Sequence, residues 1–410
     1  MRVVVVGAGL GGIALALTLR RQGIDYVVLE QATELAEVGA GIQLSSNGVR
    51  VLDYLGVASA LEAYAVEPGA HVFRDWQSGE ELLRLPLCPQ VREAFGQPYY
   101  HAHRADLLGA LVTELDGENL HLGCRVVGVA TEPGGAAVEL EDGSVERGDV
   151  VAAADGIHSL VRDQLFSPVA PVASGYAAWR GLIPGAEAER LGIERHSYIW
   201  LGPGRSMVLY YVSAGERVNW IGITPSVEAT KESWTARGTR KAALADYDGW
   251  HPQITGLIAA TEEPFVTQLF DREALAGWVE GRAVLLGDAA HAMLPYHAQG
   301  AVQSLEDAWV LGRCLALGRA DVDAALWRYE ELRRARATEV QAQSRAAQHW
   351  YHYTEPEDLA RREARFQGYR DAGSQSFSPQ QEWLYSYDAE RAALGTDDAW
   401  RRLSWRSGGG

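Results

Sequence analysis

The chain has 410 residues, a formal net charge of −17 at pH 7 and three cysteines. A chain this acidic repels phosphate, which argues against nucleic acid or an anionic membrane surface as a partner, and no apolar run approaches membrane-spanning length. Because Cys88, Cys124 and Cys314 show no C-x-x-C spacing, we expect a cytoplasmic protein without a disulfide framework. The length exceeds one ordinary core and predicts two connected domains.

The first residues are typical of a buried strand, a glycine turn and a helix. Four valines at 3–6 precede Gly7, Gly9 and Gly12 at G-x-G-x-x-G spacing, and an apolar helix is expected over 13–21. Gly7 permits the tight turn, Gly9 lets the backbone approach a pyrophosphate, and Gly12 lets helix and strand pack closely. The N–H groups and positive dipole end of the helix would then bind the phosphates. The alternative is a purely structural loop.

The next strand favours the dinucleotide interpretation. The β-rich run 25–29 ends at Glu30, an acid about 20 residues after the glycine turn, where a ribose hydroxyl needs an acceptor. Together the glycine turn and Glu30 predict an adenine-dinucleotide site.

Two aspartates follow apolar strands further along the chain. Asp155 follows the run 150–154, and Asp288 follows the run 283–287. Open α/β sheets bind ligands at the carboxyl ends of their parallel strands, so both are candidates for cofactor contacts, Asp288 with a ribitol or ribose hydroxyl. Either aspartate alone is as consistent with a helix N-cap. Together and in this order they favour the cofactor site.

The residues between these aspartates change character. Between 173 and about 270, strand-like runs separated by glycine and proline turns predict an antiparallel sheet. These runs are Ser197–Leu201, Met207–Val212 and Val218–Ile223. Residues 75–89 are expected to add strands, and 141–144 to form a hairpin turn. From Ala301 onward the pattern is mainly helical.

These motifs resemble the single-component flavoprotein aromatic hydroxylases, the group that includes p-hydroxybenzoate, salicylate and 6-hydroxynicotinate hydroxylases. The resemblance covers nearly the whole chain. It rests on Gly7–Gly12 with Glu30, Gly39–Ile42 with Asn47-Gly48, His103–Leu107, Asp155-Gly156, Gly287-Asp288, and Pro295 with Ala298–Ala301. Among the subgroups, Trp179–Gly181, Ala292–Pro295 and Trp383–Asp388 look most like salicylate hydroxylases.

The resemblance implies an α/β fold with a discontinuous Rossmann-like FAD-binding domain at 1–72, 100–172 and 271–325. An interleaved antiparallel β-sheet domain at 73–99 and 173–270 would bind the substrate, and a helical C-terminal region would follow at 326–410. The FAD-binding residues implied are Gly7, Gly9, Leu10, Gly12, Glu30, Gly41, Arg104, Asp155, Asp288, Gly300 and Ala301. Arg104 would contact the flavin from the domain interface. The dipole of a helix starting near Gly300 would stabilise the negative charge of the reduced flavin.

The activity implied is hydroxylation of a phenolic aromatic acid, with or without decarboxylation, using FAD, NADH or NADPH, and dioxygen through a flavin hydroperoxide. The sequence has no second strand–G-x-G-x-x-G–helix unit, so the nicotinamide donor is expected to bind transiently near FAD. One alternative is another aromatic substrate, such as 3-hydroxybenzoate, 6-hydroxynicotinate or a natural-product phenol. Others are epoxidation, Baeyer–Villiger insertion or dehydrogenation on the same scaffold, and a flavin-bound regulatory protein without turnover. We expect a monomer or homodimer.

Substrate contacts are expected from two places. Tyr296 and His297 precede the flavin-facing helix, and His297 would act as a base titrating near neutral pH, while Tyr296 would orient the ring or relay a proton. From the sheet, Arg180 would bind a carboxylate or brace the FAD interface, and Tyr210 would face the ring.

Neighbouring aromatic and histidine residues are weaker candidates. His196, Tyr211 and Trp220 lie on the same expected strands, where half of the side chains face away, and Trp220 is expected in the core. The pairs His101 with His103 and His349 with His352 have no matching carboxylate or cysteine set, so no metal site is expected.

Overall fold

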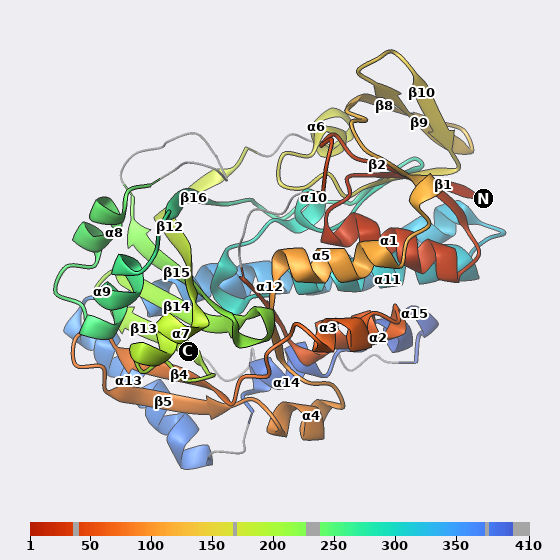
Figure 1. Cartoon of the computed structure of the whole chain (residues 1–410). Helices are drawn as coiled ribbons and strands as arrows, with labels where there is room; N and C mark the ends of the chain where they lie inside the picture. The colour runs from red at the N-terminus through yellow and green to blue at the C-terminus, as the bar shows by residue number, and fades with distance from the viewer. Residues whose placement is uncertain (36–40, 167–169, 227–237, 374–376, 397–410) are drawn as a thin grey trace.

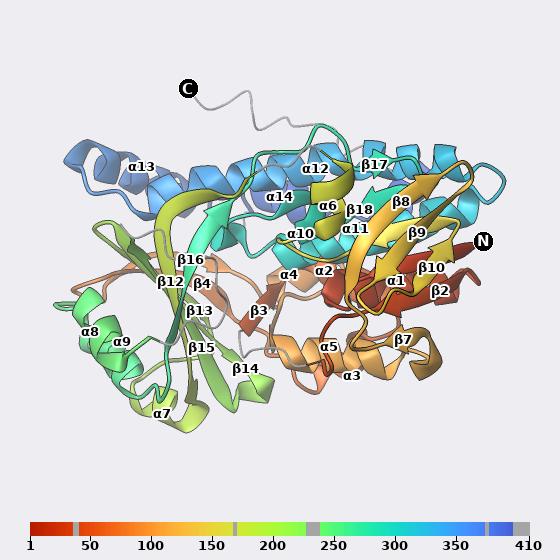
Figure 2. The same ribbon diagram turned by 90° about the horizontal axis from the view of Figure 1, so that it is seen from above.

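The computed structural model describes residues 1–35, 41–166, 170–226, 238–373 and 377–396. The chain forms two sheet-based parts that lie side by side, with long helices running across both (Figure 1). Helices α12 (Val322–Tyr351) and α13 (Pro356–Ala372) extend along one side of the molecule (Figure 2).

The first part is built on a six-stranded sheet of order β17-β18-β11-β1-β2-β7. Its strands are β1 (Arg2–Val6), β2 (Asp25–Leu29), β7 (Leu120–His121), β11 (Val150–Ala153), β17 (Val279–Glu280) and β18 (Ala283–Leu285). All neighbours pair in parallel except β17, which is antiparallel to β18. The valines of β1 are buried on both faces, Val3 and Val5 in a core that includes helices and Val4 and Val6 against a small antiparallel sheet that includes Ala136 and Val138.

Helix α1 (Leu10–Arg21) follows β1 and begins three residues earlier than the sequence predicted. It packs against α11 (Gly300–Leu317), which starts where a helix was expected. A Cβ atom at Gly312 would come within 2.4 Å of the Thr18 side chain, so the absence of a side chain there allows the two helices to approach closely.

Two small sheets complete this part. An antiparallel sheet comprises β8 (Val126–Glu132), β9 (Gly135–Leu140) and β10 (Val145–Gly148), and the predicted hairpin turn at 141–144 joins its last two strands. Strands β3 (Gly41–Leu44) and β6 (Tyr100–His103) form an antiparallel pair beside the second part.

The second part is a seven-stranded sheet of order β16-β12-β15-β14-β13-β4-β5. Its strands are β4 (Ala70–Asp75), β5 (Glu81–Pro86), β12 (Val172–Pro184), β13 (Ser197–Gly202), β14 (Arg205–Val212), β15 (Arg217–Pro225) and β16 (Phe265–Asp271). The expected strands within 75–89 are therefore present. The sheet is antiparallel except where β13 pairs with β4 in parallel.

The two faces of this sheet have different neighbours. On one face Trp220, Tyr211 and Tyr198 pack into an apolar cluster with α7 (Gly185–Arg190), α8 (Arg240–Asp246) and α9 (Pro252–Ala259). Trp220 is fully buried and donates to Thr261 Oγ1 at 2.9 Å, which confirms it as a core residue. The other face points toward α12, α13 and the first part.

The remaining helices are α2 (Ser46–Tyr54), α3 (Ala58–Glu62), α4 (Gln90–Phe95), α5 (Arg104–Thr113), α6 (Leu160–Leu165), α10 (Asp288–His291), α14 (Pro379–Tyr385) and α15 (Ala389–Leu394). Short 3₁₀ turns lie at Gly117–Asn119, Ser213–Gly215 and Pro295–His297. No helix within the described ranges is long and apolar enough to cross a membrane.

We propose that the domains divide as the sequence suggests, at 1–72, 100–172 and 271–325 for the cofactor, 73–99 and 173–270 for the substrate, and 326–410 for the helical region. All strands of the six-stranded sheet fall in the first set, and nearly all residues of the seven-stranded sheet fall in the second. Residues 397–410 of the helical region lie outside the described residues.

Candidate active site

A cavity of about 750 Å³ lies between the two parts. Its cofactor-side lining includes the predicted residues Gly9, Leu10, Gly41, Arg104, Asp155, Asp288, Gly300 and Ala301. Its sheet-side lining includes Arg180 and Tyr210, and Tyr296 and His297 close it near α11. The fold therefore brings candidates from seven segments of the chain to one place.

The glycine turn has the geometry expected of a dinucleotide site. Gly7 has φ +98°, a backbone conformation that other residues rarely adopt, and its N–H donates to Leu29 O. A Cβ at Gly12 would lie 1.9 Å from Gly7 O, so only glycine fits between helix and strand. A Cβ at Gly9 would meet none of the described residues within 4 Å, which leaves the backbone there open to the cavity.

The carboxylates of Glu30 and Asp155 have different hydrogen-bond partners. The Glu30 carboxylate accepts bonds from the N–H groups of Ala8 and Ala32, both at 2.8 Å, and thereby ties the glycine turn to the end of β2. Asp155 accepts a long bond from Val161 N, at 3.3 Å, and burial raises the pKa of its carboxyl, an effect that a hydrogen bond with the Ser159 side chain partly offsets. Ser159, not Asp155, caps α6, so the N-cap alternative does not describe Asp155.

Helix α11 begins at Gly300, and its first residues line the cavity. Asp288 is the first residue of the short helix α10 and lines the cavity beside them. The free N–H groups at the start of α11 and its positive dipole end therefore face the space between the two parts. These residues fit an FAD group, whose chemistry when bound is the transfer of reducing equivalents from NAD(P)H to dioxygen.

Arg180 and Tyr210 are the sheet candidates that line the cavity, and both side chains are almost fully buried. Burial lowers the pKa of the Arg180 guanidinium to about 10, Tyr210 opposes this effect, and the nearby Arg104 adds to it. Burial raises the pKa of the Tyr210 hydroxyl well above its usual range. His196 and Tyr211 are not part of this lining, since Tyr211 points to the other face and donates to Ile193 O.

His297 differs from the base expected from the sequence. Its Nε2 lies 3.2 Å from Gln343 O and 3.1 Å from the side-chain nitrogen of Gln380. Burial lowers the pKa of this imidazole to about 4, so it does not titrate near neutral pH as predicted but is already neutral there. Tyr296 packs against Tyr351 and His352, and burial raises the pKa of its hydroxyl far above the usual range.

The sequence missed several lining residues. Gln43 and His71 face the cavity from β3 and β4, and Tyr99 lines it from the residue just before β6 and donates to Gln43 Oε1 at 2.7 Å. Trp350 and Tyr385 come from the helical region. Periodicity could have indicated which residues of β4 share a face, but not which strand lies beside it.

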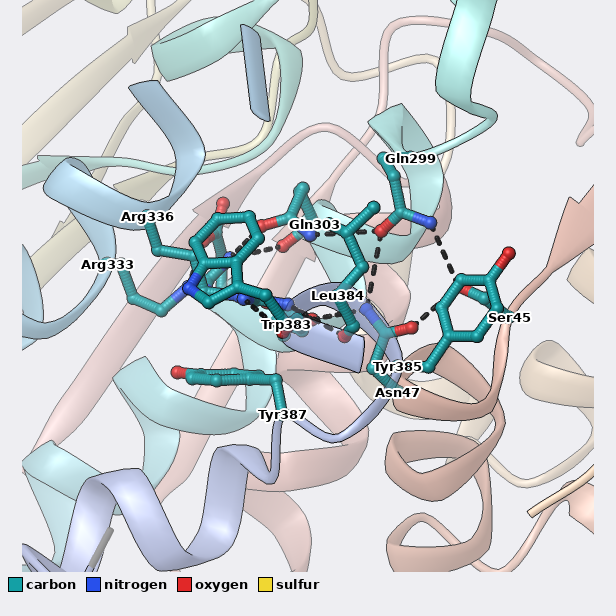
Figure 3. A network of polar contacts seen from close by, with 12 residues as sticks. Ser45, Asn47, Gln299, Gln303, Arg333, Arg336, Trp383, Leu384, Tyr385 and Tyr387 are labelled. Atoms are coloured by element: carbon teal, nitrogen blue, oxygen red, sulfur yellow. Dashed lines mark hydrogen bonds and ion pairs between the residues drawn. The ribbon is translucent and has the colours of Figure 1, made fainter. Parts of the chain in front are cut away.

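A buried polar network fixes the segment around α14 beside the cavity (Figure 3). Glu306 accepts from Arg333, Arg336 and Asn47 at 2.6 to 3.1 Å, and the side chains of Glu306 and both arginines are fully buried. Arg336 also donates to the carbonyl oxygens of Trp383 and Leu384. Burial would raise the pKa of Glu306, but Arg336 and Arg333 together lower it.

Comparison with known proteins identifies the family. The model of the FAD binding domain matches residues 1–344. The chain belongs to this FAD-binding family. It is 39% identical over 351 residues to the 3-amino-4-hydroxybenzoate 2-monooxygenase PtmB3 of Streptomyces platensis, covering 86% of this chain and 88% of the relative. It is 34% identical over 344 residues to the 6-hydroxynicotinate 3-monooxygenase of Pseudomonas fluorescens, covering 83% and 89%.

Solved structures agree with this assignment. The structure of Klebsiella pneumoniae HpxO complexed with FAD and uric acid has a TM-score of 0.80 and 29% identity, covering 97% of this chain and 95% of that chain. A salicylate hydroxylase substrate complex has a TM-score of 0.80 and 26% identity, covering 97% and 98%.

The protein is therefore an FAD-dependent aromatic monooxygenase that uses NAD(P)H and dioxygen. Within the described residues, no group of three or more histidine, cysteine, aspartate or glutamate side chains is arranged to hold a metal ion.

Proposed function

We propose that this monooxygenase hydroxylates a phenolic aromatic acid and that Arg180 binds the carboxylate. The observation that carries the proposal is a buried arginine on the sheet face of the cavity that also contains the cofactor residues. Burial and the neighbouring Arg104 disfavour the charge on this guanidinium, and an anion in the cavity would offset both effects. A carboxylate can also accept two parallel bonds from one guanidinium.

We further propose that Gly7, Gly9, Leu10, Gly12, Glu30, Gly41, Arg104, Asp155, Asp288, Gly300 and Ala301 hold FAD, and that Tyr210, Tyr296 and His297 contact the ring. The open backbone at Gly9 and the start of α11 support this placement. We also propose a cytoplasmic enzyme that is a monomer or homodimer, which light scattering of the purified protein would test.

Whether the carboxylate is retained separates two candidate reactions. PtmB3 is named as a 2-monooxygenase of 3-amino-4-hydroxybenzoate, and position 2 is not the carbon that bears the carboxylate. The similarity to this relative supports a reaction that retains the carboxylate. The likeness to salicylate hydroxylase favours the second candidate, decarboxylative hydroxylation to a catechol.

The test is a panel of aromatic acids offered to the purified FAD-bound protein with NADH or NADPH. Stimulated NAD(P)H oxidation with oxygen uptake supports the monooxygenase reaction, and the product mass shows gain of one oxygen or loss of carbon dioxide. A product without added oxygen would indicate dehydrogenation. Absence of stimulation by every member would favour a protein without turnover.

Replacing Arg180 with glutamine is expected to raise KM for the acid about 10- to 100-fold, because a charged two-point contact is lost. The effect should vanish with the corresponding carboxamide, which has no negative charge. Arg217→Gln, an exposed arginine on the adjacent strand β15, is the matched control. An equal effect on acid and carboxamide would mean that Arg180 braces the cofactor side instead.

Replacing His297 with alanine is expected to lower the hydroxylation rate about 100-fold and to divert NADH into hydrogen peroxide, since a neutral proton acceptor near the phenol is removed. FAD should remain bound. Because the pKa of His297 is about 4, its wild-type contribution should be constant at neutral pH and lost only as the pH falls through about 4. Wild-type coupling in the variant would remove His297 from the reaction.

A further inference from the structure

A row of polar side chains crosses the cavity face of the seven-stranded sheet. Ser197 on β13 pairs with His71 on β4. Tyr198 pairs with Leu209, so the next pair along β13 and β14 is Ser197 and Tyr210. His71, Ser197 and Tyr210 are therefore neighbours on three adjacent strands, and all three line the cavity.

The adjacent row on the same face is apolar. Two residues further along the strands, Ile199 pairs with Phe73 and with Val208, and Val208 pairs with Ile221. Residues two apart on a strand point to the same face, so a polar row borders an apolar row on the cavity floor. An aromatic ring can lie on the apolar row while its polar substituents reach the polar one.

Two members of the polar row have unused hydrogen-bonding capacity. Ser197 is fully buried, and its Oγ has no hydrogen-bond partner among the described residues. The Nδ1 atom of His71 is likewise buried and unbonded within the described part of the chain. Leaving such groups unsatisfied is costly, which calls for an explanation at each site. In contrast, Tyr99 beside His71 donates to Gln43.

His71 and Ser197 both offer neutral hydrogen-bond donors and acceptors. Burial lowers the pKa of His71 to about 4, so its ring is neutral at pH 7 and carries one donor and one acceptor nitrogen. The serine hydroxyl likewise both donates and accepts. This pair complements a substituent that also donates and accepts, such as an amine or hydroxyl, whereas a carboxylate only accepts.

We propose that His71 and Ser197 form a subsite that hydrogen-bonds an amino or hydroxyl substituent beside the phenol of the aromatic substrate. The subsite thereby selects rings that carry this additional group. The inference rests on the proposed function and deepens it, because Arg180 would bind the carboxylate at the other end of the ring.

The separation of the two anchors is compatible with one ring. Arg180 lies on β12, and β12, β15, β14 and β13 are consecutive neighbours in the sheet. Arg180 pairs with Ile221, so it lies in the row of Ile199 and is offset from Ser197 by two residues along the strands. Three inter-strand steps of about 4.8 Å and this offset of about 6.6 Å place the backbones of Arg180 and Ser197 roughly 16 Å apart. The long arginine side chain shortens this gap to the scale of a benzoate ring with its substituents.

The experiment compares Ser197→Ala with the wild-type holoenzyme on 3-amino-4-hydroxybenzoate and on 4-hydroxybenzoate, which lacks only the amino group. The wild-type enzyme should favour the amino compound at least about 10-fold in kcat/KM. Ser197→Ala should reduce kcat/KM for the amino compound about 10- to 100-fold. The value for 4-hydroxybenzoate should change less than about 3-fold. Binding measured from the change in flavin absorbance should follow the same pattern without turnover.

Ser206→Ala is the matched control. Ser206 is also a buried serine of this sheet, but its hydroxyl bonds His352 Nε2 at 3.0 Å and does not line the cavity. His71→Leu should reproduce the selective loss from the other side of the subsite.

The proposal is overturned if the wild-type enzyme does not favour the ring with the additional group, or if Ser197→Ala changes both compounds equally. In those cases turnover of other aromatic acids would leave the proposed function intact. If no aromatic acid stimulates NAD(P)H oxidation, the proposed function fails and the subsite proposal fails with it.

Discussion

Gly12→Val is expected to yield colourless protein that has lost FAD. The Cβ of valine would lie 1.9 Å from Gly7 O and 3.3 Å from Ala154 Cβ, and Gly7 O belongs to the backbone of the turn itself. Helix α1 must therefore move away from β1, which opens the turn and displaces the N–H groups that face the cavity. The flavin absorbance of the purified protein, relative to its protein absorbance, measures the loss.

Substitutions at two other glycines distinguish a loss of FAD binding from a loss of folding stability. Gly9→Ala should leave the thermal stability of the apoprotein unchanged, because the added methyl meets no described residue within 4 Å and φ is −70°. It should nevertheless weaken FAD binding about 10- to 100-fold, since the methyl enters the cavity. Gly109→Ala, on the open side of α5, should leave FAD binding unchanged and should not lower the stability, since alanine is favoured over glycine inside a helix. Full FAD occupancy in Gly12→Val would refute the placement of the cofactor at this turn.

The geometry of the glycine turn could be predicted because its signals are local. Val3–Val6, the glycine turn and Glu30 lie within one strand–helix–strand unit, and their spacing carries the geometry that Gly7 and Gly12 show in the structure. The boundary of α1 was misplaced by three residues, since Leu10 and two glycines at the helix start do not resemble a helix.

The substrate half could be predicted only in part, because it depends on strand pairing between distant segments. Successive side chains of a strand point to opposite faces, so Arg180 and Tyr210 each had an even chance of facing the cavity. The sequence did not show whether Tyr210 or its neighbour Tyr211 faces it. His71 and Ser197 face the cavity together only because β4 pairs with β13 in parallel, and the direction of the strands added by 75–89 was not predicted. The low pKa of His297 arises from burial, which no sequence pattern reveals.

The buried network had a sequence signal that was not used. Glu306 and Asp307 are adjacent acids in a mostly apolar helix, and Arg333 and Arg336 lie three residues apart on a later helix. Buried acids in such a helix require cationic partners. The pattern does not show which arginines approach them, or that Arg336 also holds the α14 segment.

Glu306→Gln is expected to lower the free energy of unfolding by about 3–5 kcal/mol, because it removes one charge from a buried, hydrogen-bonded cluster. Glutamine has nearly the same shape, so the loss isolates the charge that Arg333 and Arg336 both contact. The α14 segment should also become more sensitive to protease, since Arg336 no longer has a fixed position from which to donate to Trp383 O and Leu384 O. Thermal unfolding and limited proteolysis measure the two effects.

Glu363→Gln is the matched control for this prediction. Glu363 also pairs with an arginine, Arg370, but both side chains are exposed, so the change should cost less than about 1 kcal/mol. A double variant of Glu306→Gln with Arg336→Met should be clearly less destabilised than the sum of the single changes, because removing both partners leaves fewer buried charges unpaired. Additive losses, or a Glu306→Gln variant as stable as Glu363→Gln, would show that the network does not hold the segment through its charges.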